Sequence, residues 1–117
     1  METIFVYGTL KEGFGNHHFL ERALKVGKAE TSEKYGMYEM GIPFVIKHEN
    51  DTTIKGEVYL VDNVTFNNVD LLEGHPTHYR REKIKVNIDY KKHTRLTSAW
   101  IYFYPEKRGA RIIDGIY

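Results

Sequence analysis

The first part of the chain has short apolar runs separated by glycine-rich segments. Thr3–Tyr7 is a run of β-branched and aromatic residues that predicts a strand, and the glycines of Gly8–Gly15 predict a loop. Asn16 is a favourable N-cap residue for a helix. After it, apolar residues recur at helical spacing, at Phe19, Leu20, Ala23 and Leu24. The pattern predicts an amphipathic helix from Asn16 to Lys25 that stops at Gly27.

Three β-prone stretches follow, at Lys34–Glu39, Pro43–Lys47 and Thr53–Val61. The turn-forming cluster Gly41-Ile42-Pro43 separates the first two, and the polar cluster Glu49-Asn50-Asp51 separates the last two. Runs of this length with turn residues between them indicate strands of one sheet.

A second short helix is predicted after these strands. Its apolar positions are Phe66, Val69, Leu71 and Leu72. Asn63 or Thr65 is the expected cap at its start, and Gly74 and Pro76 close it. Glu73 is therefore the last residue of this helix.

The rest of the apolar pattern predicts an antiparallel hairpin. Ile84, Val86 and Ile88 alternate with polar residues, a polar turn runs through Lys91–Thr94, and the aromatic run Ala99–Tyr104 returns. About six strands and two short flanking helices in an irregular order indicate an α+β fold. We expect one domain, residues 1–117, whose sheet curls into a small mixed β-barrel.

Composition narrows the possible functions. The 117 residues carry 17 basic and 16 acidic side chains, so the strong positive field of a nucleic-acid-binding protein is missing and we expect no nucleic acid partner. The absence of cysteine excludes thiol nucleophiles and fits a reducing compartment. No apolar run is long enough for a membrane span, and no basic stretch followed by an apolar one opens the chain. We expect a cytoplasmic protein with no membrane association.

Two segments carry candidate chemistry. The strand that ends at Tyr7 is followed by Gly8, Thr9 and Leu10, and glycine permits backbone angles that expose consecutive N–H groups to an anion. Glu73 ends a helix, where the macrodipole is negative, so a carboxylate gains nothing from the backbone and its pKa is pushed upward. We interpret these segments as a substrate cradle and its base.

These segments also carry a family resemblance. The motif from Tyr7 to Lys11, then Asn16-His17, Gly56–Tyr59, Val61-Asp62 and the segment from Glu73 to Arg80 occur in an order that resembles the γ-glutamylcyclotransferase superfamily. The match is closest to its γ-glutamylamine cyclotransferase, AIG2-like branch and spans nearly the whole chain. The resemblance implies a compact mixed β-barrel flanked by helices.

The resemblance also implies a lyase that cyclises a γ-glutamyl group to 5-oxoproline and releases an amine. Glu73 matches the catalytic glutamate, which would act as general base and then as general acid. Tyr7, Gly8, Thr9 and Leu10 match the substrate loop, and Tyr79 matches a tyrosine of the family pattern. Because this cyclisation needs only positioning and proton transfer, we expect no cofactor and no metal.

Each of these residues also has a structural interpretation. The structural interpretation of Glu73 is an exposed acid that pairs with Arg80 or Arg81. Asp70, three residues earlier, either repels Glu73 or pairs with an arginine, and pairing is favoured. Tyr79 either lines the pocket or packs in the core.

Two further ligand classes are disfavoured. Glu73 and four histidines are residue types that can bind a metal ion, but their spacing is not that of a helical zinc motif. The four histidines are His17, His18, His75 and His78. The loop Gly8–Gly15 lacks the Lys-Ser or Lys-Thr that follows a phosphate-binding loop.

A binding module is the alternative to an enzyme. Basic residues near Trp100 and Tyr104 would form its surface: Lys91, Lys92, Arg95, Lys107, Arg108 and Arg111. Such a module would keep the fold and hold a small ligand or an acidic protein partner without turnover. The sequence leaves the leaving amine and the oligomeric state open.

Overall fold

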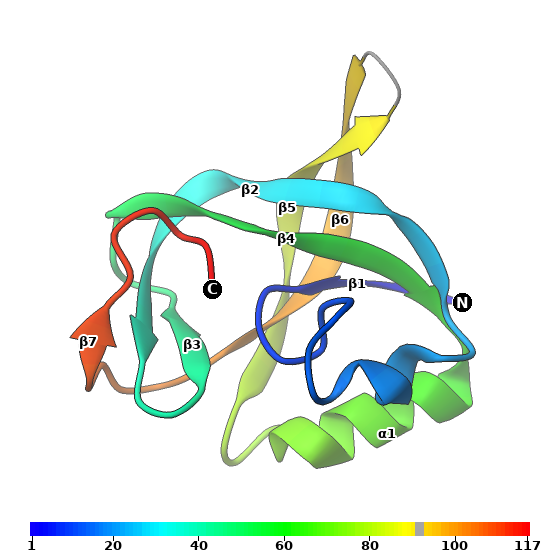
Figure 1. The fold of residues 1–117 in the computed structure, drawn as a ribbon, viewed down its shortest axis with the longest axis horizontal. Helices are drawn as coiled ribbons and strands as arrows, with labels where there is room; N and C mark the ends of the chain where they lie inside the picture. Colours follow the sequence, from blue (N-terminus) through cyan, green and yellow to red (C-terminus); the bar gives the residue numbers. More distant parts are fainter. Residues whose placement is uncertain (91–92) are drawn as a thin grey trace.

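The computed structural model describes residues 1–90 and 93–117 (Figure 1). Its elements are β1 (Glu2–Val6), the 3₁₀ helix η1 (His17–Leu20), β2 (Leu24–Glu39), β3 (Pro43–Ile46), β4 (Thr52–Val61), α1 (Asn63–Glu73), β5 (Arg80–Tyr90), β6 (His93–Phe103) and β7 (Ala110–Arg111). The fold is therefore α+β, mostly sheet, with one α-helix in the described residues.

One mixed sheet contains all of these strands, in the order β1-β4-β2-β3-β6-β5, with β7 paired to β2. Most pairs are antiparallel, but β1 and β3 each pair in parallel with β6. Additional β1–β6 and β2–β5 pairings connect strands that lie apart in this order. The predicted mixed sheet is confirmed, while its description as a barrel stays a prediction.

The strands separate two apolar clusters. In β1, Ile4 and Val6 face the cluster that includes Phe66 and Val69 of α1, whereas Phe5 faces a second cluster between the strands. This alternation follows from the two-residue period of a strand. Because both of its faces are buried, β1 is held firmly, and Tyr7 follows directly after it.

The predicted cap of helix α1, Asn63 or Thr65, is wrong by one or three residues, whereas the helix ends at Glu73 as predicted. Asp62 is the N-cap, and its carboxylate accepts a hydrogen bond from the Thr65 N–H at 2.7 Å. Gly74 is the C-cap in the left-handed conformation, with φ of 67°. The helix lies along one end of the sheet beside η1, and the β5–β6 hairpin projects from the opposite end (Figure 1).

The predicted helix from Asn16 to Lys25 is wrong. Only His17–Leu20 is helical, as a single 3₁₀ turn, and Leu24 already belongs to β2. Leu20 is buried, but Leu24 is 61% exposed and pairs with Leu60 in the neighbouring strand. The apolar residues at helical spacing therefore do not share one buried face of a helix. Gly27 lies inside β2 at a register shift, where a Cβ would sit 3.0 Å from the Asp89 carbonyl oxygen. It permits close approach of strands rather than ending a helix.

The other predicted strands are confirmed with changed limits. Lys34–Glu39 forms only the last six residues of the 16-residue β2, and the hairpin strands β5 and β6 extend beyond their apolar residues. Of the predicted turn Lys91–Thr94, Lys91 and Lys92 lie outside the described residues, and Thr94 belongs to β6. Within residues 1–90 and 93–117, no helix is long and apolar enough to cross a membrane.

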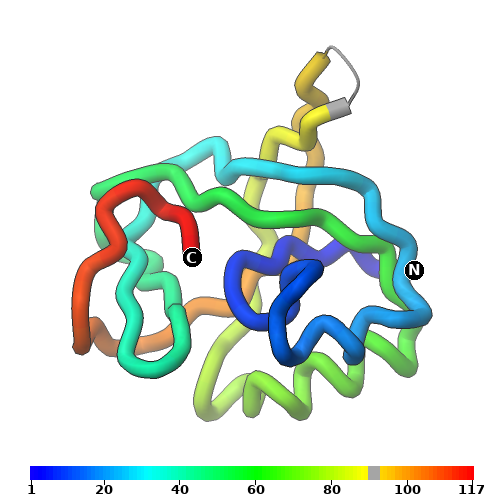
Figure 2. The backbone as a smooth tube through the Cα atoms, viewed as in Figure 1, coloured from blue at the N-terminus to red at the C-terminus, as the bar shows by residue number. Residues whose placement is uncertain are grey.

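The end of the chain returns along β2 and β4 (Figure 2). The Ile112 N–H donates to the Met37 carbonyl at 2.8 Å, and the Lys55 N–H donates to the Gly115 carbonyl at 2.9 Å. The Lys11 ammonium donates to the Tyr117 carbonyl at 2.7 Å. These contacts tie the end of the chain to the loop that follows β1.

Candidate active site

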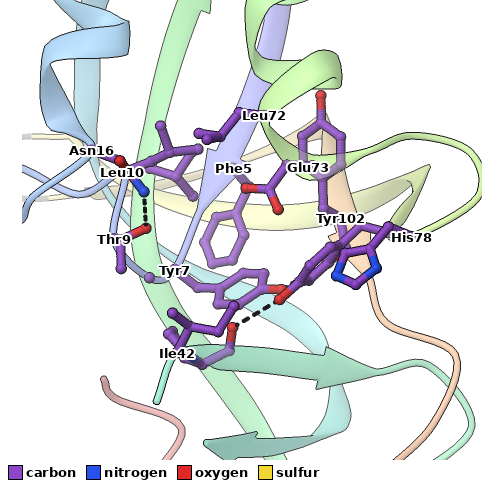
Figure 3. Close-up of a pocket in the computed structure, with 14 residues that line it drawn as sticks. Phe5, Tyr7, Thr9, Leu10, Asn16, Ile42, Leu72, Glu73, His78 and Tyr102 are labelled. Atoms are coloured by element: carbon purple, nitrogen blue, oxygen red, sulfur yellow. Dashed lines mark hydrogen bonds between the residues drawn. The ribbon is translucent and has the colours of Figure 1, made fainter. Parts of the chain in front are cut away.

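A cavity of about 160 Å³ lies where β1 ends beside the last turn of α1 (Figure 3). Its walls include every residue that the sequence singled out for the site: Tyr7, Gly8, Thr9, Leu10, Glu73 and Tyr79. Pockets for drug-sized ligands are larger, about 300–1,000 Å³. The cavity therefore suits a group about the size of one amino acid.

Gly8 fits the site for a different reason from the predicted one. Its φ is not in the left-handed region; instead, a Cβ at this position would lie 2.6 Å from Cγ of Pro43. The absence of a side chain thus lets the start of β3 approach the loop after β1. The glycine sets the width of the cavity by allowing this contact.

Hydrogen bonds hold the loop after Gly8 in one shape. The Lys11 N–H donates to the Gly8 carbonyl at 3.0 Å, and the Asn16 N–H donates to the Thr9 carbonyl at 2.9 Å. The Asn16 side-chain amide also donates to the Thr9 hydroxyl at 2.9 Å, so it fastens the loop instead of capping a helix. The N–H groups of Gly8, Thr9 and Leu10 donate to no described residue. Three consecutive amides therefore remain available beside the cavity.

Glu73 projects into this cavity from the last position of α1 (Figure 3). Burial raises the pKa of its carboxyl from 4.5 to about 7. The carboxylate makes no hydrogen bond or ion pair with the described residues. The alternative interpretation, in which Glu73 pairs with Arg80 or Arg81, is therefore wrong. The predicted direction of the pKa shift is confirmed, but its cause is desolvation rather than the helix dipole.

Two tyrosines, Tyr7 and Tyr79, also line the cavity. The Tyr7 hydroxyl donates to the Tyr102 carbonyl at 2.8 Å, and the Tyr79 hydroxyl donates to the Pro43 carbonyl at 3.4 Å. Burial, followed by the nearby Glu73 charge, raises the pKa of both phenols. Both hydroxyls therefore stay protonated at neutral pH. Tyr79 is buried and also lines the cavity, so it both packs in the core and borders the pocket.

Asp70 lies one turn before Glu73 and is fully engaged. The Arg81 Nε is 2.9 Å from its Oδ1, and the Tyr102 hydroxyl donates to the same oxygen. The Arg81 guanidinium in turn lies 4.4 Å from the ring centroids of both Phe66 and Trp100. Pairing of Asp70 with an arginine is thus confirmed. The sequence did not identify Tyr102, because its place beside α1 depends on long-range strand pairing.

The histidines do not converge on one point. His17 Nδ1 contacts the Leu10 carbonyl at 2.9 Å, His18 Nδ1 contacts the Gly15 carbonyl at 3.1 Å, and His75 Nδ1 accepts from the Arg81 N–H. Across the described parts of the chain, no three His, Asp or Glu side chains are arranged to hold a metal ion. His78 lines the cavity, although the sequence offered no reason to place it there.

The suggested basic surface is dispersed. Lys107 pairs with Glu49 at 3.3 Å and Arg111 with Asp51 at 3.5 Å, while Arg108 contacts Tyr104. Lys91 and Lys92 lie outside the described residues, and Arg95 is on the projecting hairpin. The basic residues that stack on Trp100 are Arg81 and Lys83 instead.

The fold and this cavity define a small α+β protein whose cavity is lined by an unpaired carboxylate and by three consecutive residues with unpaired amides. The family described as gamma-glutamyl cyclotransferase, AIG2-like, matches residues 4–116, and the chain belongs to this family. A protein of Methanocaldococcus jannaschii, provisionally named as a gamma-glutamylcyclotransferase, is 46% identical over all of this chain and 96% of its own length. A similarly named protein of Vibrio cholerae is 39% identical over 88% of this chain and 82% of its own length.

Solved structures share the fold. An uncharacterised protein of Pyrococcus horikoshii superposes with a TM-score of 0.77 and 31% identity, covering 99% of this chain and 89% of that one. A mouse AIG2-like protein superposes with a TM-score of 0.79 and 28% identity, covering 88% and 76% of the two chains. The architecture described above is therefore that of known AIG2-like structures.

Proposed function

We propose that this protein cyclises the γ-glutamyl group of a γ-glutamylamine to 5-oxoproline and releases the amine. The observation that carries the proposal is Glu73, an unpaired carboxyl with a pKa of about 7 that lines the same small cavity as three residues with unpaired amides. Membership of the gamma-glutamyl cyclotransferase family supports the same reaction.

The amides of Gly8, Thr9 and Leu10 would bind the α-carboxylate of the glutamyl group, because free backbone N–H groups are suited to an anion. A bound substrate would fold so that its α-amine approaches its own γ-carbonyl. Holding the chain in this conformation supplies much of the rate enhancement, because the reaction is intramolecular.

Glu73 would transfer the proton. As carboxylate it takes a proton from the α-ammonium, and the amine nitrogen then attacks the γ-carbonyl carbon. As the bond to the leaving nitrogen breaks, the protonated Glu73 returns the proton to that nitrogen. The regenerated Glu73 carboxylate then takes the second proton from the ring nitrogen, which leaves neutral 5-oxoproline, and passes it to the released amine, which departs as an ammonium. A pKa near the working pH suits a group that must act both as base and as acid. No water is consumed, and the residues named here suffice for the chemistry.

The phenols of Tyr7 and Tyr79 would border the glutamyl group as neutral walls. Both hydroxyls already donate to backbone carbonyls, which fixes their rings. We assign them to positioning of the substrate and not to proton transfer, because burial raises the pKa of both phenols.

The test is product formation. Purified protein is incubated with γ-glutamyl-ε-lysine, γ-glutamyl-alanine and glutathione, and 5-oxoproline is quantified by mass spectrometry, with Glu73→Gln alongside. We expect 5-oxoproline from at least the first substrate and its loss in the variant. Calorimetry of 5-oxoproline binding separates an enzyme from a binding module. Retained affinity in Glu73→Gln without turnover supports the enzyme, whereas binding without turnover in the wild type favours the module.

A further inference from the structure

A second cavity, of about 270 Å³, adjoins the candidate active site and shares His78 with it. We call it the distal pocket. Tyr79 lines the first cavity and Tyr104 lines the distal pocket. The rings of His78, Tyr79 and Tyr104 are in mutual contact, with centroids 5.2 to 5.3 Å apart. These three rings form a thin aromatic wall between the two cavities.

The charged groups of the distal pocket are mostly basic. Lys47, His48 and Arg80 line it together with one acid, Glu82. Lys47 Nζ lies 2.6 Å from Glu82 Oε1, so these two charges compensate each other. Neither Arg80 nor His48 makes a hydrogen bond or ion pair with the described residues. The pocket thus keeps the uncompensated charge of Arg80.

The rest of the lining is apolar. Ile46 and Phe103 are buried at its base, and Pro105 follows Tyr104 at its side. The Arg108 guanidinium lies 5.1 Å from the centroid of the Tyr104 ring and adds positive charge near this edge. An apolar base beside an unpaired cation suits a ligand with an aliphatic chain that ends in an anionic group.

We propose that the distal pocket binds the leaving half of the substrate and selects amines whose aliphatic chain ends in a carboxylate. This inference rests on the proposed function, since it places the scissile bond beside Glu73. The carboxylate of an α-amino acid is only two bonds from the leaving nitrogen, too short to reach over the exposed edge of the aromatic wall at His78. A diamine has the necessary length, but its free ammonium would face Arg80 and be repelled.

The experiment uses two substrates of equal length that differ in one group. γ-Glutamyl-6-aminohexanoate carries the terminal carboxylate, and γ-glutamyl-hexylamine lacks it. We expect kcat/KM for 5-oxoproline release to favour the acid by about fivefold, the upper range for an exposed ion pair. Arg80→Gln should remove this preference by raising KM for the acid alone, and Arg80→Glu should invert it. γ-Glutamyl-alanine should be unaffected by either change.

Arg95→Gln is the matched control, because Arg95 is exposed on the projecting hairpin and makes no ion pair with described residues. Equal use of the two substrates by the wild type, or a preference that survives Arg80→Glu, overturns the inference. Calorimetry with Glu73→Gln measures binding of both substrates without turnover. A carboxylate preference there that depends on Arg80 supports the pocket even when the wild type forms no 5-oxoproline, a result that would overturn the proposed function alone.

Discussion

Asp70 and Glu73 are carboxylates one turn apart on the same helix, and their surroundings differ completely. Asp70 accepts from Arg81 and Tyr102, and the Arg81 guanidinium itself packs against both Phe66 and Trp100. Glu73 has no partner among the described residues and faces a cavity. The same chemical group is thus structural where its charge is matched and available for proton transfer where burial leaves it unmatched.

Replacing Glu73 should produce the largest effect. We expect Glu73→Gln to lower kcat by about 100- to 10,000-fold, the usual contribution of a general acid–base group, because the amide cannot carry the proton. Thermal unfolding should show no loss of stability, since the variant removes a buried ionisable group that has no partner. Turnover within tenfold of the wild type would contradict the role of Glu73.

Asp70→Ala should act mainly on stability. It leaves Arg81 packed against two aromatic rings without its carboxylate and removes the acceptor for the Tyr102 hydroxyl. We expect the free energy of unfolding to fall by about 2–3 kcal/mol, measured by urea denaturation. The control is Asp89→Ala on β5, whose exposed side chain makes no ion pair with described residues. An equal, small loss in both variants would argue against a structural role for Asp70.

The raised pKa of Glu73 predicts a pH dependence of stability. Between pH 4.5 and about 7 the folded protein holds a proton on Glu73 that the unfolded chain releases, so the free energy of unfolding falls as pH rises through this range. The loss is complete above pH 7 and amounts to about 2 kcal/mol, allowing for partial solvent access. Urea denaturation of the wild type and Glu73→Gln at pH 5 and pH 8 measures it. A constant difference between the two proteins would contradict the shift.

Tyr102→Phe should have the smallest effect. It removes one hydrogen bond to Asp70 but leaves the Arg81 contact and the ring in place. We expect a loss of about 1 kcal/mol in the free energy of unfolding and a modest fall in kcat, because the last turn of α1 is held less firmly. Loss of turnover as complete as in Glu73→Gln would instead place the Tyr102 hydroxyl in the chemistry.

The parts of the fold that follow from local pattern were predictable. Pro43–Lys47 and Thr53–Val61 are β-prone runs between turn residues, and both form strands. Gly74 ends α1 because glycine readily adopts the left-handed conformation of a helix C-cap. The structure of the segment from Asn16 to Lys25 was not predictable, because its few apolar residues fit a helix as well as they fit a compact turn followed by a strand. Pairing of Leu24 with Leu60 decides between them, and such long-range contacts leave no local signal.

The candidate site divides in the same way. Glu73 and the Tyr7–Leu10 segment were identified from short motifs with a physical rationale. The close approach of Gly8 and Pro43 could not be identified from the sequence, because these residues are 35 positions apart and only the sheet brings them together. Arg80 and Tyr104 likewise meet at the distal pocket because β5 and β6 pair. Sequence identified the groups that we propose carry the chemistry, and tertiary pairing determined which groups surround them.

The most direct test of the central claim is the pH dependence of kcat/KM for 5-oxoproline release from γ-glutamyl-6-aminohexanoate. If Glu73 is the base, the rate should rise with pH through a midpoint near 7, the value to which burial raises its pKa. A profile whose acid limb has its midpoint near 4.5, or no acid limb above pH 5, would contradict a role for this buried, unpaired carboxyl in the proton transfer.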